Sequence, residues 1–262
     1  MATVLEIQNF LESLAPSYMK MEWDRIGLNC GHSDAKVDTV LIALDPFSHV
    51  CQEAKDVGAQ LLLTHHALIW DAGFVNDSTE TGRNTMFLLQ NGIAHINAHT
   101  NLDCAPGGVN DCLAAALGLQ DISIIDPVGT DAQGREYGLL RQGYVVEQSL
   151  ETFLGMLRET LGCQGIKYTQ GSPTVHRVAV GGGSCADSLC AVNEAGCDTF
   201  VTADAKYNDY WDAKALGVNL IDAGHFHTEN PVCSMLAQKL QAAFPDIKVI
   251  LSKTHSDCAK FF

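Results

Sequence analysis

Positively charged residues are scarce in this sequence, and long apolar runs are absent. The 262 residues include 16 Lys and Arg against 31 Asp and Glu, so the formal net charge at pH 7 is −15. Nucleic acids are bound through clustered Lys and Arg, so DNA or RNA is not expected as a partner. A membrane span needs roughly 20 apolar residues, and no run approaches that length. We therefore expect a protein that neither binds nucleic acid nor crosses a membrane.

Signals for export and for disulfides are also lacking. The N-terminus has no basic segment; Val4, Ile7, Leu11 and Leu14 instead recur at helical spacing and predict an amphipathic helix that ends near Pro16. The ten cysteines contain no Cys-x-x-Cys pair, which is the spacing typical of zinc sites and redox motifs. We expect buried or incidental thiols in a reducing cytoplasm.

Strands and helices alternate along the chain. Apolar β-rich runs are followed by a small or polar turn and a helical pattern, as over residues 37–59 and 86–119. This alternation predicts an α/β fold with largely parallel sheets, and the 47% hydrophobic content suffices for a sizeable core. The pattern changes near residue 128 without a low-complexity linker. We predict two interlinked α/β domains, residues 1–127 together with 222–262, and residues 128–221.

Two adjacent histidines, His65 and His66, end an apolar run in "LLLTHHALIW". Neighbouring side chains on a strand point to opposite faces, whereas the turn after a strand lets them converge. Open α/β sheets bind ligands beyond the carboxyl ends of their strands. The pair is therefore a candidate binding site. The simpler alternative is one solvated histidine beside one bonded to a backbone carbonyl.

A second predicted strand, residues 94–98, is followed by His99 and Asp103 in "AHTNLDCAPGG". An imidazole and a carboxylate four residues apart can face one point, and the Pro-Gly-Gly loop allows close backbone approach. The alternative for Asp103 is a turn or helix-capping residue.

A third predicted strand, residues 218–222, leads to His225 and Glu229 in "LIDAGHFHTENP". Pro231 fits only the first turn of a helix, so the next helix is predicted to begin near residue 228. Glu229 would then lie in the first turn, where a favourable helix-dipole interaction is the alternative explanation.

Imidazole and carboxylate ligands together suit zinc, manganese, iron or nickel. Five candidate ligands exceed the needs of one tetrahedral ion with an open position, and they suit two ions about 3.5–4 Å apart. An unliganded histidine, His99, is the candidate catalytic residue for proton transfer. We predict two divalent metal ions per chain, bound by His65, His66, Asp103, His225 and Glu229.

The motifs "EWDRIGLNCG", "THHALIW", "AHTNLDCAPGGVND", "AVGGGS", "FVTADAKYND" and "AGHFHTE" occur in order along almost the whole chain. Together they resemble the Nif-three-like dinuclear metal-centre proteins, often labelled GTP cyclohydrolase type 2. The chain departs from that family in having Arg25 where Asn is usual. It is also too short for the extra domain that longer members carry.

The resemblance implies a two-domain α/β protein that is cytoplasmic in bacteria and assembles into a homohexamer. It implies the same five metal ligands and, for some members, a ring-opening hydrolysis of GTP. We expect a metal-dependent hydrolase that acts on a nucleotide or related heterocycle. The alternative is a hexameric metal-binding scaffold or regulatory protein without turnover.

Two further features have open roles. The Gly181-Gly182-Gly183 run follows a predicted strand, where it forms either a phosphate-binding loop or a tight turn before a helix. Asp204 follows the predicted strand 199–202, where it either lines the cleft facing the metals or caps a helix.

Overall fold

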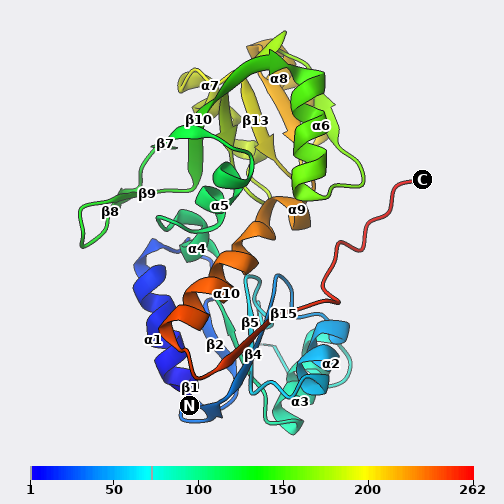
Figure 1. Cartoon of the computed structure of the whole chain (residues 1–262). Coiled ribbons are helices and arrows are strands. Elements are labelled where there is room, and N and C mark those ends of the chain that lie inside the picture. Colours follow the sequence, from blue (N-terminus) through cyan, green and yellow to red (C-terminus); the bar gives the residue numbers. More distant parts are fainter. Residues whose placement is uncertain (1, 72) are drawn as a thin grey trace. The chain divides into compact units, whose positions relative to one another are not determined.

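The chain alternates helices and strands through most of its length. The structure is a computed structural model, and it describes residues 2–71 and 73–262. Figure 1 shows the alternation from the N-terminus (blue) to the C-terminus (red), and it confirms the predicted α/β class. The chain forms two compact units, each made of two stretches of sequence. Unit 1 consists of residues 1–102 and 233–256, and unit 2 of residues 103–232 and 257–262.

The chain passes between the units inside two helices, α4 (Thr100–Cys104) and α10 (Pro231–Ala243). The first boundary was predicted near residue 127, whereas the chain enters unit 2 earlier, at residue 103 within α4. Residues between the two positions stay with unit 2 because β7 (Gln120–Ile125) pairs with β10 (Leu140–Ser149) of that unit.

Unit 1 is built around a five-stranded sheet in the order β15-β4-β5-β6-β2. The first three pairings are parallel, and β2 is added antiparallel to β6. Thr64, at the end of β5, stands opposite Ala43 of β4 and Asn97 of β6. The chain therefore leaves these strands at one edge of the sheet, the edge where such sheets bind ligands. The strands are β2 (Gly27–Cys30), β4 (Thr39–Ala43), β5 (Leu61–Thr64), β6 (Ala94–Asn97) and β15 (Lys248–Leu251).

Helices cover both faces of the unit 1 sheet, with α2 and α3 on one side and α1 and α10 on the other (Figure 1). The first helix begins with a capping box between Thr3 and Glu6 and buries Val4, Ile7 and Leu11. It confirms the amphipathic helix predicted for the N-terminus. The remaining elements of the unit are α1 (Val4–Leu14), α2 (Ser48–Asp56), α3 (Glu80–Gln90), the 3-10 turn η1 (Ser17–Met19), and the paired strands β1 (Ala2–Thr3) and β3 (Lys36–Val37).

Unit 2 contains a mixed six-stranded sheet in the order β11-β14-β13-β12-β10-β7. The central strands β12, β13 and β14 pair in parallel, whereas β11, β10 and β7 are joined antiparallel. The predicted parallel pairing thus describes most of the unit 1 sheet and the centre of this one. The strands not yet given are β11 (Lys167–Thr169), β12 (Thr174–Val180), β13 (Thr199–Thr202) and β14 (Asn219–Asp222), with a separate hairpin of β8 (Gly129–Thr130) and β9 (Glu136–Tyr137).

The unit 2 sheet buries apolar side chains on both faces. Val178 packs with Phe153 of α6, and the next residue along β12, Ala179, packs in the cluster that holds Leu189 of α7 and Ala213 of α8. This follows from the alternation of side chains along a strand. The helices are α5 (Val109–Ala116), α6 (Leu150–Leu161), α7 (Leu189–Glu194), α8 (Tyr207–Leu216) and α9 (His225–Glu229), with the 3-10 turn η2 (Ala186–Ser188).

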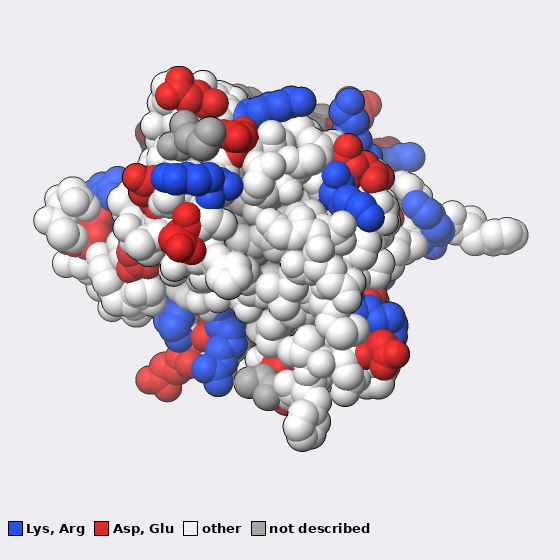
Figure 2. Space-filling view, turned by 90° about the horizontal axis from the view of Figure 1, so that it is seen from below, with Lys and Arg blue, Asp and Glu red and all other residues white. Residues whose placement is uncertain are grey.

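Several expectations drawn from composition concern the whole chain. All ten cysteines are free thiols, and six of them are buried. In the part of the chain that the structure describes, no helix combines the length and the apolar character needed to cross a membrane. On the face shown in Figure 2, Lys and Arg side chains are interspersed with Asp and Glu and do not gather in one patch.

Candidate metal centre

Three histidines meet at the ligand-binding edge of the unit 1 sheet. His65 and His66 follow β5, and His99 follows β6. One ligand atom from each of the three lies within 4.8 Å of the others. The ring centroids are 5.0 Å apart for His65 with His66 and with His99, and 5.5 Å for His66 with His99. The convergence expected after a strand therefore occurs, and it includes His99.

Each of these imidazoles has its Nδ1 held by an oxygen atom. His65 Nδ1 lies 2.8 Å from the carbonyl oxygen of Ala98, His66 Nδ1 lies 2.6 Å from Asp45 Oδ1, and His99 Nδ1 lies 3.0 Å from Asp24 Oδ1. A carbonyl or carboxylate oxygen only accepts, so Nδ1 carries the proton and donates it. The lone pair is then on Nε2, and imidazoles oriented in this way are typical metal ligands.

Asp24 is buried, with an exposed fraction of 3%. Burial acts to raise its pKa, but hydrogen bonds from His99 and Thr100 and the nearby His99 charge outweigh burial and lower the pKa to about 2. The backbone N–H groups of Arg25 and Thr100 also donate to this carboxylate. Asp24 is therefore an ionised, fixed partner that orients His99. Asp24 lies in the motif "EWDRIGLNCG", but its spacing in the sequence does not indicate this role.

Asp45 also lacked a predicted role, although it comes just after β4. Its position repeats the signal used for the histidines, a polar residue at the carboxyl end of a parallel strand. Asp45 and Pro46 fall at the polar turn that is predicted within residues 37–59. In the structure the carboxylate of Asp45 orients His66.

In unit 2, His225 and Glu229 lie on one face of the short helix α9. The helix that contains Pro231 is α10, which begins at Pro231, so Pro231 lies in its first turn as predicted, but the start is three residues later than residue 228. Glu229 instead ends the separate helix α9, which begins at His225 after Gly224 with φ of 88°, so the prediction that Glu229 lies in a first turn is wrong. His225 and Glu229 are thus four residues apart on the helix, and His225 Nε2 lies 3.1 Å from Glu229 Oε2.

Asp204 resolves one of the open roles. It follows β13 with φ of 53°, and its Oδ2 lies 2.6 Å from His225 Nδ1. A positive φ is costly for a residue other than Gly. The carboxylate fixes the proton on Nδ1 of His225, as Asp45 does for His66. The fourth imidazole therefore has the same arrangement as the three in unit 1.

The glycine run forms a tight turn against α9. The N–H of Gly181 donates to Val201 O, that of Gly182 to Asn110 Oδ1, and that of Gly183 to Thr228 Oγ1. These bonds use the donors that a phosphate-binding loop would present, so the tight-turn alternative holds. A Cβ on Gly183 would lie 2.2 Å from Glu229 Oε1 and 3.1 Å from His225 Nε2. The missing side chain at Gly183 therefore makes room for both candidate ligands.

Asp103 lies near the end of α4 and is 6% exposed. Its carboxylate comes within 4.8 Å of that of Glu229. Burial first, then the charges of Asp103 and Glu229, raise the pKa of the Cys185 thiol well above its usual value. The backbone of Asp103 accepts from Asn110 Nδ2 at 3.2 Å. Within unit 2 the structure thus brings Asp103, His225 and Glu229 together.

Arg141 holds the chain just after Asp103 in place. It is 1% exposed, and its Nη2 donates to the carbonyl oxygens of Cys104 and Ala105 at 3.3 and 3.2 Å. Its Nε and Nη2 also donate to the two carboxylate oxygens of Asp111, both at 3.0 Å. A forked guanidinium suits such a task because its donors have fixed directions. Nothing in the local sequence pattern marks Arg141, since these three partners lie 30 to 37 residues away.

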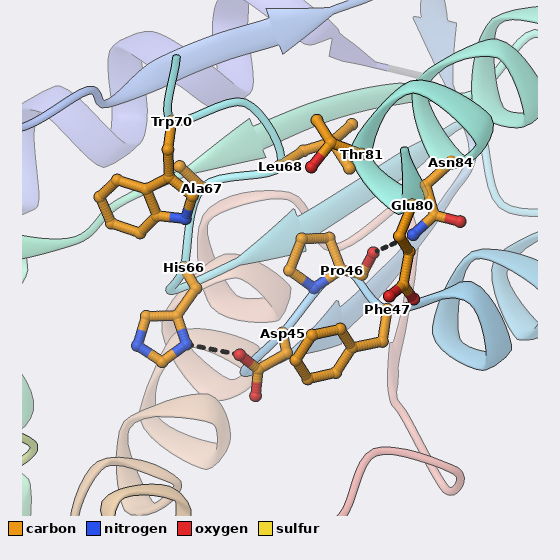
Figure 3. Close-up of a pocket in the computed structure, with 10 residues that line it drawn as sticks. All are labelled: Asp45, Pro46, Phe47, His66, Ala67, Leu68, Trp70, Glu80, Thr81 and Asn84. Carbon is orange, nitrogen blue, oxygen red and sulfur yellow. Dashed lines mark hydrogen bonds and ion pairs between the residues drawn. The ribbon is translucent and has the colours of Figure 1, made fainter. Parts of the chain in front are cut away.

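A cavity of about 270 Å³ adjoins His66 (Figure 3). Phe47 and Trp70 line it and are 46% and 44% exposed. Its charged groups are the acidic side chains of Asp45 and Glu80, and Glu80 also accepts a hydrogen bond from Ser48 at 3.0 Å. The cavity offers aromatic surface and acidic groups next to a candidate ligand.

These residues fit divalent metal ions by the chemistry of their donor atoms. Four imidazoles are oriented through Nδ1, and within unit 2 the carboxylate of Glu229 lies near His225 and near that of Asp103. Imidazole nitrogen and carboxylate oxygen suit zinc, iron, manganese and nickel. Acidic partners on the far side of the imidazoles make them more basic ligands.

Comparisons with known proteins find relatives that match almost the whole chain. The chain is 36% identical over 268 residues to a Streptomyces coelicolor protein named GTP cyclohydrolase 1 type 2 homolog, covering 98% of this chain and 93% of that one. It is 32% identical over 262 residues to a Clostridium perfringens protein of the same name, covering 98% of both.

Solved structures show the same fold. A Bacillus cereus protein described as related to NIF3 superposes with a TM-score of 0.94 at 25% identity, over 100% of this chain and 99% of that one. A Staphylococcus aureus protein gives 0.92 at 27% identity with the same coverage. The sequence profile of the Duf34/NIF3 (NGG1p interacting factor 3) family matches residues 2–258. The chain belongs to the Duf34/NIF3 family.

Proposed function

We propose that this protein is a metal-dependent hydrolase with two divalent ions per chain. The observation that carries the proposal is the common orientation of four histidines. His65, His66, His99 and His225 each donate through Nδ1 to a carbonyl or carboxylate, which leaves the lone pair on Nε2. A buried structural histidine needs no such repeated arrangement, whereas metal ligands almost always have it.

The proposed ligands are the five that the sequence indicated: His65, His66, Asp103, His225 and Glu229. Zinc, iron, manganese and nickel all suit this set. A divalent ion, when bound, activates water for attack by lowering its pKa. The protein's own part is to fix the ligand directions through Asp45 and Asp204.

His99 is the proposed proton carrier. Asp24 holds its Nδ1 at 3.0 Å, so a proton would be taken up or released at Nε2. The rings of Trp70 and His99 pack in a T-shaped arrangement, with centroids 4.9 Å apart and planes at 81°. This packing keeps the imidazole from rotating away from its neighbours. A change of His99 to Gln is expected to remove turnover and to leave both metal ions bound.

The substrate proposed is a nucleotide or a related heterocycle. The support is the printed name of the relatives, GTP cyclohydrolase 1 type 2 homolog, together with the aromatic walls of the cavity beside His66. A ring system can stack on Phe47 or Trp70, and a hydrolytic ring opening needs the activated water that metal ions supply.

The first test is metal content and turnover on one sample, purified without chelator. We expect two ions per chain in the wild type and none in the His65→Ala/Glu229→Ala variant. The matched control is His32→Ala/Glu147→Ala, which removes the same residue types from exposed positions of the two units. It is expected to keep both ions. GTP turnover is followed by chromatography on the same preparations.

Two results would overturn the proposal in different ways. Two ions per chain in the His65→Ala/Glu229→Ala variant would remove the ligand assignment. A wild type that holds two ions but leaves GTP and other nucleotides and heterocycles unchanged would favour the alternative, a metal-binding scaffold or regulator without turnover. The cytoplasmic homohexamer implied by the family resemblance belongs to the same proposal, and light scattering that gives the 28.2 kDa of a single chain would contradict it.

A further inference from the structure

A second cavity lies in unit 1, and it shares the side chain of Trp70 with the cavity in Figure 3. Its volume is about 430 Å³, and Trp70 lines both cavities. Lys20 and Arg25 contribute two positive charges to its wall, and Ile26 and Ile69 contribute apolar surface. Neither the metal ligands nor the proposed proton carrier uses these two cations.

The charged groups of the two cavities differ. Among the described residues, the cavity beside His66 is lined by Asp45 and Glu80 and by no Lys or Arg. The second cavity holds the two cations Lys20 and Arg25 with a single carboxylate, that of Asp24. Two cations in one cavity are notable because the chain has only 16 Lys and Arg against 31 acidic residues. An anionic group would be repelled from the first cavity and attracted to the second.

Lys20 and Arg25 form no ion pair with any described carboxylate. Lys20 Nζ donates to the backbone oxygens of Met21 and Asp24, at 3.3 and 3.2 Å, which fixes the ammonium while leaving it a further donor. Among the described residues, no carboxylate lies within ion-pair distance of Lys20 or of the Arg25 guanidinium. The Asp24 carboxylate in this wall is occupied by His99 and Thr100 and by the N–H of Arg25.

Hydrogen bonds to Asn29 hold the loop that carries Trp70, the residue that lines both cavities. Asn29 accepts the N–H groups of Leu68 and Ile69, both at 3.0 Å, and donates to Gly27 O and Asn97 Oδ1. The loop that carries Trp70 is thereby tied to β2 and β6. Asp24 lines the second cavity and also orients His99. A group bound there would therefore lie next to the histidine cluster.

We propose that the Lys20–Arg25 cavity binds an anionic oxygen group of the substrate, either a phosphate or a carboxylate. The substrate is then a bipartite molecule whose uncharged ring enters the cavity of Phe47 and Trp70 and whose anionic end lies against Lys20 and Arg25. Arg25 supplies paired N–H donors that match such oxygens in two places at once. The role as a substrate subsite rests on the proposed hydrolase function, but anion binding itself is measurable without turnover.

The test compares two double variants that lose the same charge. Lys20→Gln/Arg25→Gln removes both cations of the cavity, and Lys36→Gln/Arg158→Gln removes two exposed cations elsewhere. Each metal-containing preparation is titrated with inorganic phosphate and, separately, with acetate, and tryptophan fluorescence is recorded because Trp70 lines the cavity. We expect the dissociation constant for the preferred anion to rise about tenfold or more in the first variant only.

The two anions distinguish the chemical class of the bound group. Phosphate binding tighter than acetate identifies a phosphate ester as the substrate's anionic end, and the reverse identifies a carboxylate. Equal dissociation constants for both double variants, or a wild type that binds neither anion, would overturn the subsite. Metal content is measured on the same samples. A wild type without metal or turnover that still shows the Lys20- and Arg25-dependent binding would refute the hydrolase and leave the anion site standing.

Discussion

The two units present histidines in the same orientation but support them differently. In unit 1, His65 is fully buried and His99 is 9% exposed, and both follow strands of a sheet. In unit 2, the side chain of His225 is 37% exposed, and the Asp204 that orients it is 52% exposed. The common feature is therefore the Nδ1 contact, and the difference lies in how much surrounding structure enforces it.

This difference predicts how easily a substitution displaces the candidate ligands of each unit. The register of a central strand fixes where its last residue points, so the unit 1 histidines are set by the sheet itself. A helix of five residues, α9, has no stability of its own. It depends on tertiary contacts such as the bond from Gly183 N to Thr228 Oγ1, 3.0 Å long. Substitutions that remove packing contacts should therefore displace the ligands of unit 2 more, whereas loss of an orienting acid should weaken metal binding more in unit 1, where that acid is less exposed.

The largest expected effect comes from Arg141→Met, which removes a buried guanidinium from unit 2. Asp111 and the carbonyl oxygens of Cys104 and Ala105 lose their donors. Breaking one side of a buried ion pair costs about 3 kcal/mol. We expect denaturant unfolding to show the transition of unit 2 shifted to lower denaturant, with that of unit 1 unchanged. Metal content should fall because Asp103 is no longer held.

The matched control for that prediction is Arg135→Met, also in unit 2. Its ion pair with Asp131 has the Arg side chain 56% exposed, and exposed pairs contribute at most about 1 kcal/mol. If both variants lost the same stability, the buried position of Arg141 would be irrelevant. If Arg141→Met lost stability but kept full metal content, its role in positioning Asp103 would be wrong.

A smaller effect on folding, with a large effect on metal binding, is expected from Gly183→Ala. The added Cβ would come 2.2 Å from Glu229 Oε1, and φ at this position is +66°. Gly118→Ala is the control, because its φ is +72° but nothing lies within 4 Å of the new Cβ. Both should lose about 1 kcal/mol of stability through the positive φ. Only Gly183→Ala should lose metal, as measured by elemental analysis; retained metal there would mean that Glu229 is not a ligand.

The contributions of the orienting acids in the two units can be compared by changing Asp45 and Asp204 one at a time. In Asp45→Asn and Asp204→Asn the amide can still accept a hydrogen bond, but it no longer makes the imidazole more basic. Loss of such a partner weakens metal binding about 10- to 100-fold. We expect Asp45→Asn to lie nearer the upper figure, because the Asp45 side chain is 20% exposed and that of Asp204 is 52% exposed. Competition with a metal-binding dye measures both affinities, and a larger loss for Asp204→Asn would reverse the ranking of the two units.

What the sequence could predict of the site was the part encoded locally. The apolar run before His65 and His66 marked the end of β5, and the run before His99 marked the end of β6. Apolar runs show where strands end because core strands must be apolar on both faces. Pro231 marked the start of α10, but the separate short helix α9 before it was not predicted, since only Gly224 indicates the turn at which it begins.

The pairing of each orienting acid with its histidine could not be predicted because the two residues are distant in sequence. Asp24 is 75 residues from His99, and Asp45 is 21 residues from His66. Local periodicity carries no information about which strand lies beside which. The register of β4 against β5 brings Asp45 to His66, and this register is a property of the folded sheet. The fold class was predictable, whereas these pairings depend on topology.

The smallest expected effect concerns the C-terminal segment of unit 1. Glu53 on α2 accepts hydrogen bonds from Ser252 Oγ, Lys253 N and Thr254 Oγ1. Burial acts to raise its pKa, but these bonds outweigh it and lower the pKa below the model-compound value of 4.5. Glu53→Gln keeps the size of the side chain and should cost about 1 kcal/mol in the free energy of unfolding at pH 7.

The pH dependence of this stabilisation has a definite sign. A lowered folded-state pKa means that the unfolded chain takes up the proton first, so the contribution is complete above pH 4.5 and is lost as pH falls below it. Wild type and Glu53→Gln should therefore differ in unfolding free energy at pH 7 and converge toward pH 3. A difference that stayed constant over this range would show that Glu53 acts through packing alone. The C-terminal segment would then be held by burial and not by hydrogen bonds to the Glu53 carboxylate.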